Sequence, residues 1–391
     1  MSSEFDAVID RRNTDSLKWD VADGELPMWV ADMDFPTAPA VRKAITERAE
    51  KGVFGYSVIP ERWYEAYTSW WKRRHGLDSE RDWFIFCTGV IPAISSAVRK
   101  LTTPAENVVV LTPVYNIFFN SVLNNGRVVK ECPLRYENGS YEIDFFALES
   151  ALSDPQATMM ILCNPHNPIG KIWSKEELCR IGEMCRKYSV TVISDEIHCD
   201  LTDPGKDYTP FASASDTCRS VSITCLAPTK AFNIAGIQTA AVMVPNPVLR
   251  HKVWRGLNTD EVAEPNSFAV DAAAAAFLDG AEWLDSLRAY IAENKRTARE
   301  FIENNIPSLT LTPSDATYLL WLHYVHADKN ASAVAEHIRS ETGLFLSSGE
   351  QYRGNGADFF RLNIACPRLV LLDGLERLKR GLESFEKANK S

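Results

Sequence analysis

Short runs of β-branched and other apolar residues, recurring through the middle of the chain, constrain the fold more than any other feature. They lie at 108–112, 159–163, 190–194, 220–225 and 240–244. A helix-like stretch at 174–188 lies between two of them, and Ser174 and Glu177 form a capping box at its start. Fully apolar strands that alternate with helices are typical of buried parallel sheets. The chain therefore predicts an α/β domain with buried parallel strands.

The remainder of the chain predicts a second, smaller unit. Residue spacing indicates helices over 39–51, 61–75, 282–304 and 368–388, and strands over 317–324 and 359–365. We expect a large α/β domain with a mostly parallel sheet over 49–288. A small α+β domain is expected to combine 1–48 with 289–391.

Composition narrows the class of protein. Among 391 residues, 45% are apolar and the net charge is −10, which fits a folded protein and disfavours nucleic acid or an anionic membrane as partner. No run of about eighteen apolar residues predicts a membrane span, and the polar N-terminus does not resemble a signal peptide. Nine cysteines, an odd number without a CxxC pair, indicate reduced thiols. We expect a cytoplasmic protein without a metal site.

Four groups of chemically versatile residues follow predicted strands. They are the glycine turn at 88–91, the amides Asn164 and Asn167, the carboxylate of Asp195, and Lys230 among small and apolar neighbours. Each group alone has an ordinary structural explanation, as a turn, a loop, a helix cap or a lysine that extends to solvent. Loops at the carboxyl ends of strands also line ligand sites in α/β sheets.

The order of these groups matches the needs of one cofactor, pyridoxal phosphate. A desolvated lysine can form a Schiff base with its aldehyde, and an aspartate can keep its ring nitrogen protonated. An amide can bind the ring hydroxyl, a glycine turn at a helix start can bind the phosphate, and an aromatic residue such as Tyr115 can stack on the ring. Arg361, in the predicted strand at 359–365, is the last residue of this series along the chain.

At these positions the sequence resembles the fold-type I pyridoxal-phosphate enzymes of the aminotransferase class I/II group, and in particular the MalY/PatB-type C–S lyases (cystathionine β-lyases and cystalysin). The segments that carry the resemblance span nearly the whole chain: LPMWVADMDFPTAPAVRKAI (26–45), FGYSVIP (54–60), TGVIPAI (88–94), LTPVYNIF (111–118), CNPHNPIGKIW (163–173), SDEIHCDL (194–201), APTKAFNIAGIQ (227–238) and RLNIACPR (361–368).

The resemblance implies specific roles. Lys230 is implied as the Schiff-base lysine and general base, and Tyr115 as a proton donor. The implied cofactor-binding residues are Lys230, Asp195, Asn167, His198, Tyr115, Gly89, Val90, Ile91, Thr229 and Tyr56. Arg361, Asn167 and Tyr56 are implied to bind substrate, and Tyr56 would do so in the neighbouring subunit of a homodimer.

The resemblance also implies the reaction, a β-elimination from L-cystathionine or a related cysteine S-conjugate to a thiol, pyruvate and ammonia. An aminotransferase is the alternative, and a binding or regulatory protein on the same scaffold is a third possibility. Aminotransferases of this fold usually carry a tyrosine and an arginine where this chain has His198 and Gln238. These two departures favour the lyase.

Overall fold

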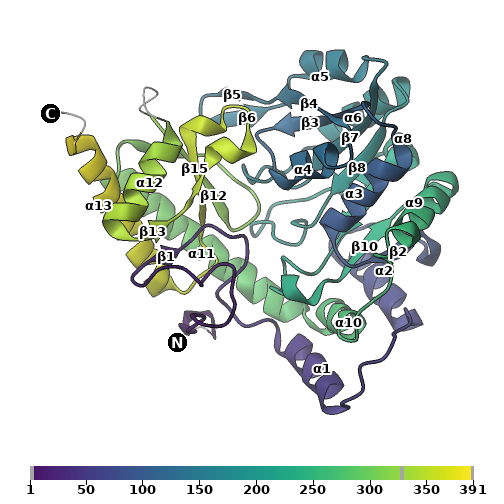
Figure 1. Cartoon of the computed structure of the whole chain (residues 1–391), viewed down its shortest axis with the longest axis horizontal. Coiled ribbons are helices and arrows are strands. Elements are labelled where there is room, and N and C mark those ends of the chain that lie inside the picture. Colours follow the sequence, from purple (N-terminus) through teal and green to yellow (C-terminus); the bar gives the residue numbers. More distant parts are fainter. Residues whose placement is uncertain (1–3, 326–329, 389–391) are drawn as a thin grey trace.

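A seven-stranded sheet organises one half of the molecule in this computed structural model, which describes residues 4–325 and 330–388 (Figure 1). Predictions for 1–3, 326–329 and 389–391 lie outside the described residues. In spatial order the strands are β2 (Phe84–Cys87), β10 (Ala240–Met243), β9 (Ser222–Leu226), β8 (Thr191–Asp195), β7 (Ala157–Cys163), β3 (Asn107–Thr112) and β4 (Val128–Pro133). The predicted α/β architecture is confirmed.

One expectation about this sheet was wrong. The run at 240–244 was predicted to form a parallel strand, but β10 is antiparallel to both β2 and β9. The connection from β9 to β10 contains a 3₁₀ helix and no α-helix. A parallel return is usually made through a crossover α-helix, and this connection, residues 227–239, has none.

Helices cover both faces of the sheet, and alternate strand residues face different layers. Val108 and Val110 pack with α3 (Val90–Leu101), α4 (Ile117–Leu123) and α9 (Pro247–Thr259). Val109 and Leu111 pack in the opposite layer. The helices of that layer are α5 (Phe145–Leu152), α6 (Lys175–Lys187), α7 (Phe211–Ala214) and α8 (Asp216–Val221). Helices α2 (Glu61–His75) and α10 (Ala269–Asp279) bury aromatic residues beside the β2 edge.

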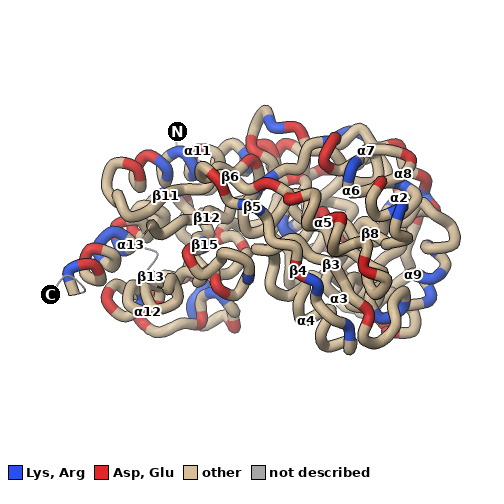
Figure 2. Tube along the Cα trace, turned by 90° about the horizontal axis from the view of Figure 1, so that it is seen from above, with Lys and Arg blue, Asp and Glu red and all other residues tan. Residues whose placement is uncertain are grey.

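The other half of the molecule is built from the C-terminal residues and the start of the chain (Figures 1 and 2). Its four-stranded antiparallel sheet has the order β11 (Leu309–Leu311), β12 (Leu319–Tyr324), β15 (Phe359–Asn363) and β14 (Ser347–Ser348). Strand β1 (Leu26–Pro27) pairs in parallel with β13 (Leu344–Phe345), which ties the N-terminus to this half. The predicted domain limits remain a prediction, and the limit at 288 falls inside α11 (Ala281–Asn305).

The remaining elements are α1 (Pro39–Glu50), α12 (Ala331–Thr342), α13 (Arg368–Ala388), the β5–β6 hairpin (Arg135–Glu137 and Ser140–Glu142), and 3₁₀ helices at Glu4–Asp6, Arg81–Trp83, Ala235–Ile237, Gly349–Tyr352 and Gly356–Asp358. Local chemistry explains several ends. Pro39 occupies the first turn of α1, and the predicted capping box of Ser174 and Glu177 begins α6. Gly76 ends α2 in the left-handed conformation that glycine adopts easily.

Basic and acidic residues are interspersed along both halves in the view of Figure 2. Among the described residues, no helix combines the length and the apolar character needed to cross a membrane.

Candidate active site

A pocket of about 340 Å³ lies where strands of the large sheet end. Strands β3, β7, β8 and β9 are parallel, and β2 runs in the same direction because β10 is antiparallel to both of its neighbours. The carboxyl ends of these strands therefore meet at one edge. The lining residues are Ala31, Thr88, Gly89, Val90, Ile91, Pro92, Tyr115, Cys163, Asn167, Asp195, Ile197, His198, Thr229, Lys230, Ala235 and Gln238.

Most of the site residues expected from the sequence come together here. The pocket contains the glycine turn, Tyr115, Asn167, Asp195, His198, Thr229 and Lys230. Arg361 approaches from β15, with Nη1 3.4 Å from Asn167 Oδ1. Tyr56 does not join them in the single chain, because its side chain is fully exposed on the segment before α2.

Lys230 follows β9 and is half-buried. Its Nζ donates a hydrogen bond of 2.6 Å to the carbonyl of Ala31, almost two hundred residues earlier in the chain. Burial lowers the pKa of this amine to about 8, helped by the charge of Arg361 and opposed by Asp32 and Asp195. A substantial fraction of the amine is therefore neutral near pH 7 to 8, as a base or nucleophile requires.

Asp195 and His198 are buried at the pocket, and their polar side-chain atoms have few hydrogen-bond partners. Burial raises the pKa of Asp195 to about 7, although its Oδ1 accepts the Ile197 N–H at 3.1 Å and Lys230 lowers the value. Among the described residues, no cation forms an ion pair with Asp195 and no partner bonds Nδ1 of His198. Burial, with Lys230 and Arg361, lowers the pKa of His198 to about 3, so this imidazole is neutral. A bound group with a cationic N–H would satisfy the buried Asp195 carboxylate.

The glycine turn supplies a different kind of ligand. Gly89 is the N-cap of α3, so the first N–H groups of this helix have no intrahelical acceptor. Val90 and Ile91, which carry such N–H groups, line the pocket together with Thr88 and Gly89. A helix start of this kind binds phosphate through its N–H groups and its dipole.

Arg361, on β15 in the C-terminal half of the chain, brings a guanidinium to Asn167 of the pocket. It is buried, and its Nη2 donates to the Trp29 carbonyl at 2.8 Å. Within the described residues its Nε has no hydrogen-bond partner. A guanidinium with a free N–H beside the Asn167 amide is suited to a carboxylate.

Tyr115 follows β3 and contacts Phe118 edge to face. Burial raises the pKa of its phenol to about 12, with Asp195 in the same direction and Arg361 opposing. The hydroxyl is therefore protonated at neutral pH and can donate a proton.

One expectation is corrected and one group was missed. Asn164 was expected to help fix a ligand, but its Nδ2 instead donates to the Thr209 carbonyl, outside the pocket lining. The sequence patterns predicted no role for Ala31, for Tyr318 or for the buried Asn363. Ala31 acts through its backbone carbonyl, for which no side-chain pattern is a signal.

Comparison with known proteins identifies the family. The family described as aminotransferase class I and II matches residues 26–378. The chain belongs to this family. The chain is also similar to the cystathionine beta-lyase PatB of Bacillus subtilis (strain 168), at 41% identity over 385 residues, 97% of this chain and 99% of that protein.

Two further proteins are similar to this chain over nearly its whole length. Protein MalY of Escherichia coli (strain K12) is 31% identical, over 96% of this chain and 97% of that protein. The crystal structure of cystalysin from Treponema denticola, which contains a pyridoxal 5'-phosphate cofactor, superposes with a TM-score of 0.95 at 32% identity. It covers 98% of this chain and all of that one. The predicted family and fold are confirmed.

Proposed function

We propose that this protein is a pyridoxal-phosphate-dependent C–S β-lyase that cleaves L-cystathionine or related cysteine S-conjugates to a thiol, pyruvate and ammonia. The observation that carries the proposal is the full-length similarity to a cystathionine beta-lyase together with a pocket that gathers the expected residues. The alternative, an aminotransferase, shares the family.

The residues of the pocket fit the cofactor. A buried carboxylate without a cationic partner, Asp195, suits a protonated ring nitrogen, and the start of α3 at Gly89 suits the phosphate. The unpartnered Nδ1 of His198 and the amide of Asn167 are polar groups that the ring hydroxyl can satisfy. Thr229 adds a hydroxyl and Tyr115 an aromatic face.

The chain's own groups account for binding and proton transfer. When bound, pyridoxal phosphate supplies an electron-accepting ring that withdraws electrons from the substrate Cα. Arg361 and Asn167 bind the substrate carboxylate and orient the Cα–H bond toward Lys230. The Lys230 Nζ, with its pKa lowered to about 8, removes the Cα proton. Asp195 keeps the proton on the ring nitrogen.

The second half of the reaction breaks the Cβ–S bond. Tyr115 holds its proton at neutral pH and donates it to the leaving sulfur, so that a neutral thiol departs. The unsaturated amino acid that remains hydrolyses to pyruvate and ammonia.

Product analysis separates the two enzymatic functions. Purified protein with its cofactor should release pyruvate and a thiol from L-cystathionine without any keto acid. An aminotransferase would instead need a keto-acid acceptor and would leave the C–S bond intact. Failure to release pyruvate, with amino transfer to an added keto acid, would overturn the lyase.

We also propose that the protein acts as a homodimer. Residues 51–60 form an extended and largely exposed segment, on which Val53, Phe54, Tyr56 and Val58 are between 55% and 102% exposed. Contiguous exposed apolar residues of this kind mark interaction surfaces. A partner subunit on this surface supports the role of Tyr56 in the neighbouring site. The nine free thiols support a reducing compartment, the cytoplasm.

A further inference from the structure

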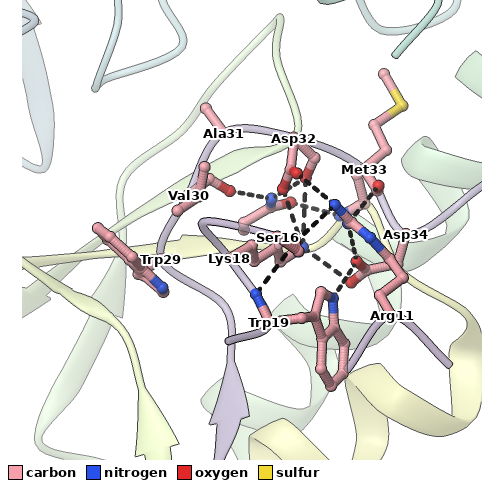
Figure 3. Close-up of polar contacts among 12 residues, drawn as sticks. Arg11, Ser16, Lys18, Trp19, Trp29, Val30, Ala31, Asp32, Met33 and Asp34 are labelled. Carbon is pink, nitrogen blue, oxygen red and sulfur yellow. Dashed lines mark hydrogen bonds and ion pairs between the residues drawn. The ribbon is translucent and has the colours of Figure 1, made fainter. Parts of the chain in front are cut away.

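Residues 29–34, called here the acceptor segment, contribute Ala31 to the pocket lining and form many polar contacts (Figure 3). Its carbonyls alternate in direction. The Trp29 and Ala31 carbonyls accept from the site residues Arg361 and Lys230, at 2.8 and 2.6 Å. The Val30 and Asp32 carbonyls both accept from Nδ2 of Asn363, each at 2.6 Å. One buried amide therefore bonds the carbonyls on either side of Ala31.

The side chains of the acceptor segment are also fixed. Lys18 is buried and lies 2.8 Å from the Asp34 carboxylate, while Arg11 pairs with both Asp32 and Asp34 at 2.8 Å (Figure 3). The Trp19 indole donates to Asp34 at 2.7 Å. These contacts leave little freedom for the peptide plane between Ala31 and Asp32 to rotate.

We propose that the Ala31 carbonyl is the acceptor that holds the Lys230 amine whenever this amine is not bonded to the cofactor, and that Asn363 is the positioning residue that orients this carbonyl. The inference rests on the proposed role of Lys230 as the base. Once Lys230 has taken the substrate proton, its ammonium needs an acceptor, and the Ala31 oxygen lies 2.6 Å away. The carbonyl thereby stabilises the protonated base and keeps it at one place in the pocket.

A second donor shares the same oxygen. The hydroxyl of Tyr318, a buried residue just before β12, donates to the Ala31 carbonyl at 3.1 Å. Its proton points toward the oxygen that also receives the Lys230 ammonium, so it weakens this acceptor. Other groups that act on Lys230 are the carboxylates of Asp32 and Asp195, the Arg361 guanidinium and the neutral imidazole of His198.

The two contacts predict opposite changes in the pKa of Lys230. Asn363→Ala frees the acceptor segment, so the ammonium loses a directed hydrogen bond and its pKa falls by about one unit. Tyr318→Phe removes the competing donor, so the pKa rises. The pKa can be measured on the cofactor-free full-length chain by labelling with trace acetic anhydride across pH, with the Lys230 peptide quantified by mass spectrometry.

Asn294 offers a matched control. It is buried as completely as Asn363, and its Nδ2 also donates to two backbone carbonyls, those of Ile364 and Cys366, both at 2.9 Å. It has no contact with the acceptor segment among the bonds described. Asn294→Ala should therefore cost similar stability and leave the labelling midpoint of Lys230 unchanged.

The outcomes are distinct. The proposal is supported if the labelling midpoint of Lys230 falls in Asn363→Ala, stays unchanged in Asn294→Ala and rises in Tyr318→Phe. The acid limb of the kcat-against-pH profile should move in the same direction as the midpoint in each variant. Equal shifts in both asparagine variants, or no shift in Asn363→Ala, overturn it. If Asn363→Ala does not fold, Tyr318→Phe decides alone, and a midpoint that does not rise overturns the proposal. Labelling needs no turnover, so it is independent of the pyruvate test of the lyase function.

Discussion

The Lys230 amine is the group on which the proposed chemistry depends most. Lys230→Ala should reduce pyruvate release from L-cystathionine by at least roughly 10²–10⁴-fold, because the base that removes the Cα proton is lost. Lys171→Ala is a matched control, since Lys171 also donates to a backbone carbonyl, that of Tyr141 at 2.6 Å, outside the pocket lining. Circular dichroism should show both variants folded. Substantial residual turnover in Lys230→Ala would assign the base elsewhere.

The Arg361 guanidinium donates to the Trp29 carbonyl and, in the proposed function, also binds the substrate carboxylate. Arg361→Lys keeps the charge but loses the planar fork that binds a carboxylate, so kcat/KM should fall by about ten- to a hundredfold, mainly through KM. Arg250→Lys is the control, because Arg250 donates to the Val244 and Pro245 carbonyls away from the pocket. Steady-state kinetics on both variants test this. An unchanged KM in Arg361→Lys would contradict substrate binding.

The raised pKa of Glu196, the residue after Asp195, should make the free energy of unfolding depend on pH. It is buried, accepts from Ser194 and Phe211 at 2.8 Å and from the Tyr208 hydroxyl, and burial raises its pKa from 4.5 to about 7. The folded state therefore binds this proton more tightly than the unfolded state. Its contribution is full below pH 4.5 and is lost as the pH rises through about 7.

Glu196→Gln should remove this part of the slope, which is at most about 1.4 kcal/mol per pH unit for one group. The free energy of unfolding, measured by denaturant titration between pH 5 and 7 without cofactor, checks it. Glu183→Gln, at an exposed position of α6, should leave the slope as it is in the wild type. An unchanged slope in Glu196→Gln would mean that this carboxyl is already ionised at pH 5.

At the scale of elements, the acceptor segment depends on a buried cluster of charges. Lys18→Met removes the buried ion pair between Lys18 and Asp34. Breaking a buried pair by removing one partner lowers the free energy of unfolding by about 3–5 kcal/mol. Lys43→Met removes an exposed pair with Glu47 within α1 and should change stability by less than about 1 kcal/mol. Denaturant unfolding of the two variants makes the comparison. Equal small losses would show that the Lys18 pair contributes little.

Much of the element pattern was predictable because it follows local rules. The helices at 61–75 and 368–388 have the predicted bounds, and β3, β7, β8 and β9 lie within a few residues of the predicted runs. The direction of β10 was not predictable from its composition, since an apolar run is the same in parallel and antiparallel sheets. The structural difference lies in the preceding connection, which contains no crossover α-helix.

The site was partly predictable for the same reason. Asp195 and Lys230 follow buried strands, so their position at one sheet edge follows from the α/β pattern. The contact between Lys230 and Ala31 could not be predicted, because a carbonyl oxygen is present at every residue. It depends on how the N-terminal residues pack against Asn363, which is a tertiary property.

At the scale of the whole molecule, subunit mixing tests the proposed dimer. If Tyr56 acts in the partner's site, Tyr56→Ala and Lys230→Ala proteins should each be nearly inactive. After subunit exchange, half of the dimers are hybrids with one complete site, so activity should recover to about a quarter of the wild-type value. If Tyr56 acts only in its own subunit, mixing restores nothing. Light scattering of the mixture confirms that dimers are present.

The hydrogen bonds between Asn363 and the acceptor segment join distant parts of the chain, since Val30 and Asn363 are 333 positions apart. A ribosome adds roughly 5–20 residues per second, so roughly 17–67 s separate the synthesis of Val30 from that of Asn363. By the end of this interval the strands of the large sheet, the last of which ends at Met243, are outside the ribosome. Until then the Ala31 carbonyl has no fixed direction. Lys230 is therefore made, and the preceding strand β9 can fold, well before the Ala31 carbonyl oxygen that accepts its hydrogen bond is set in place.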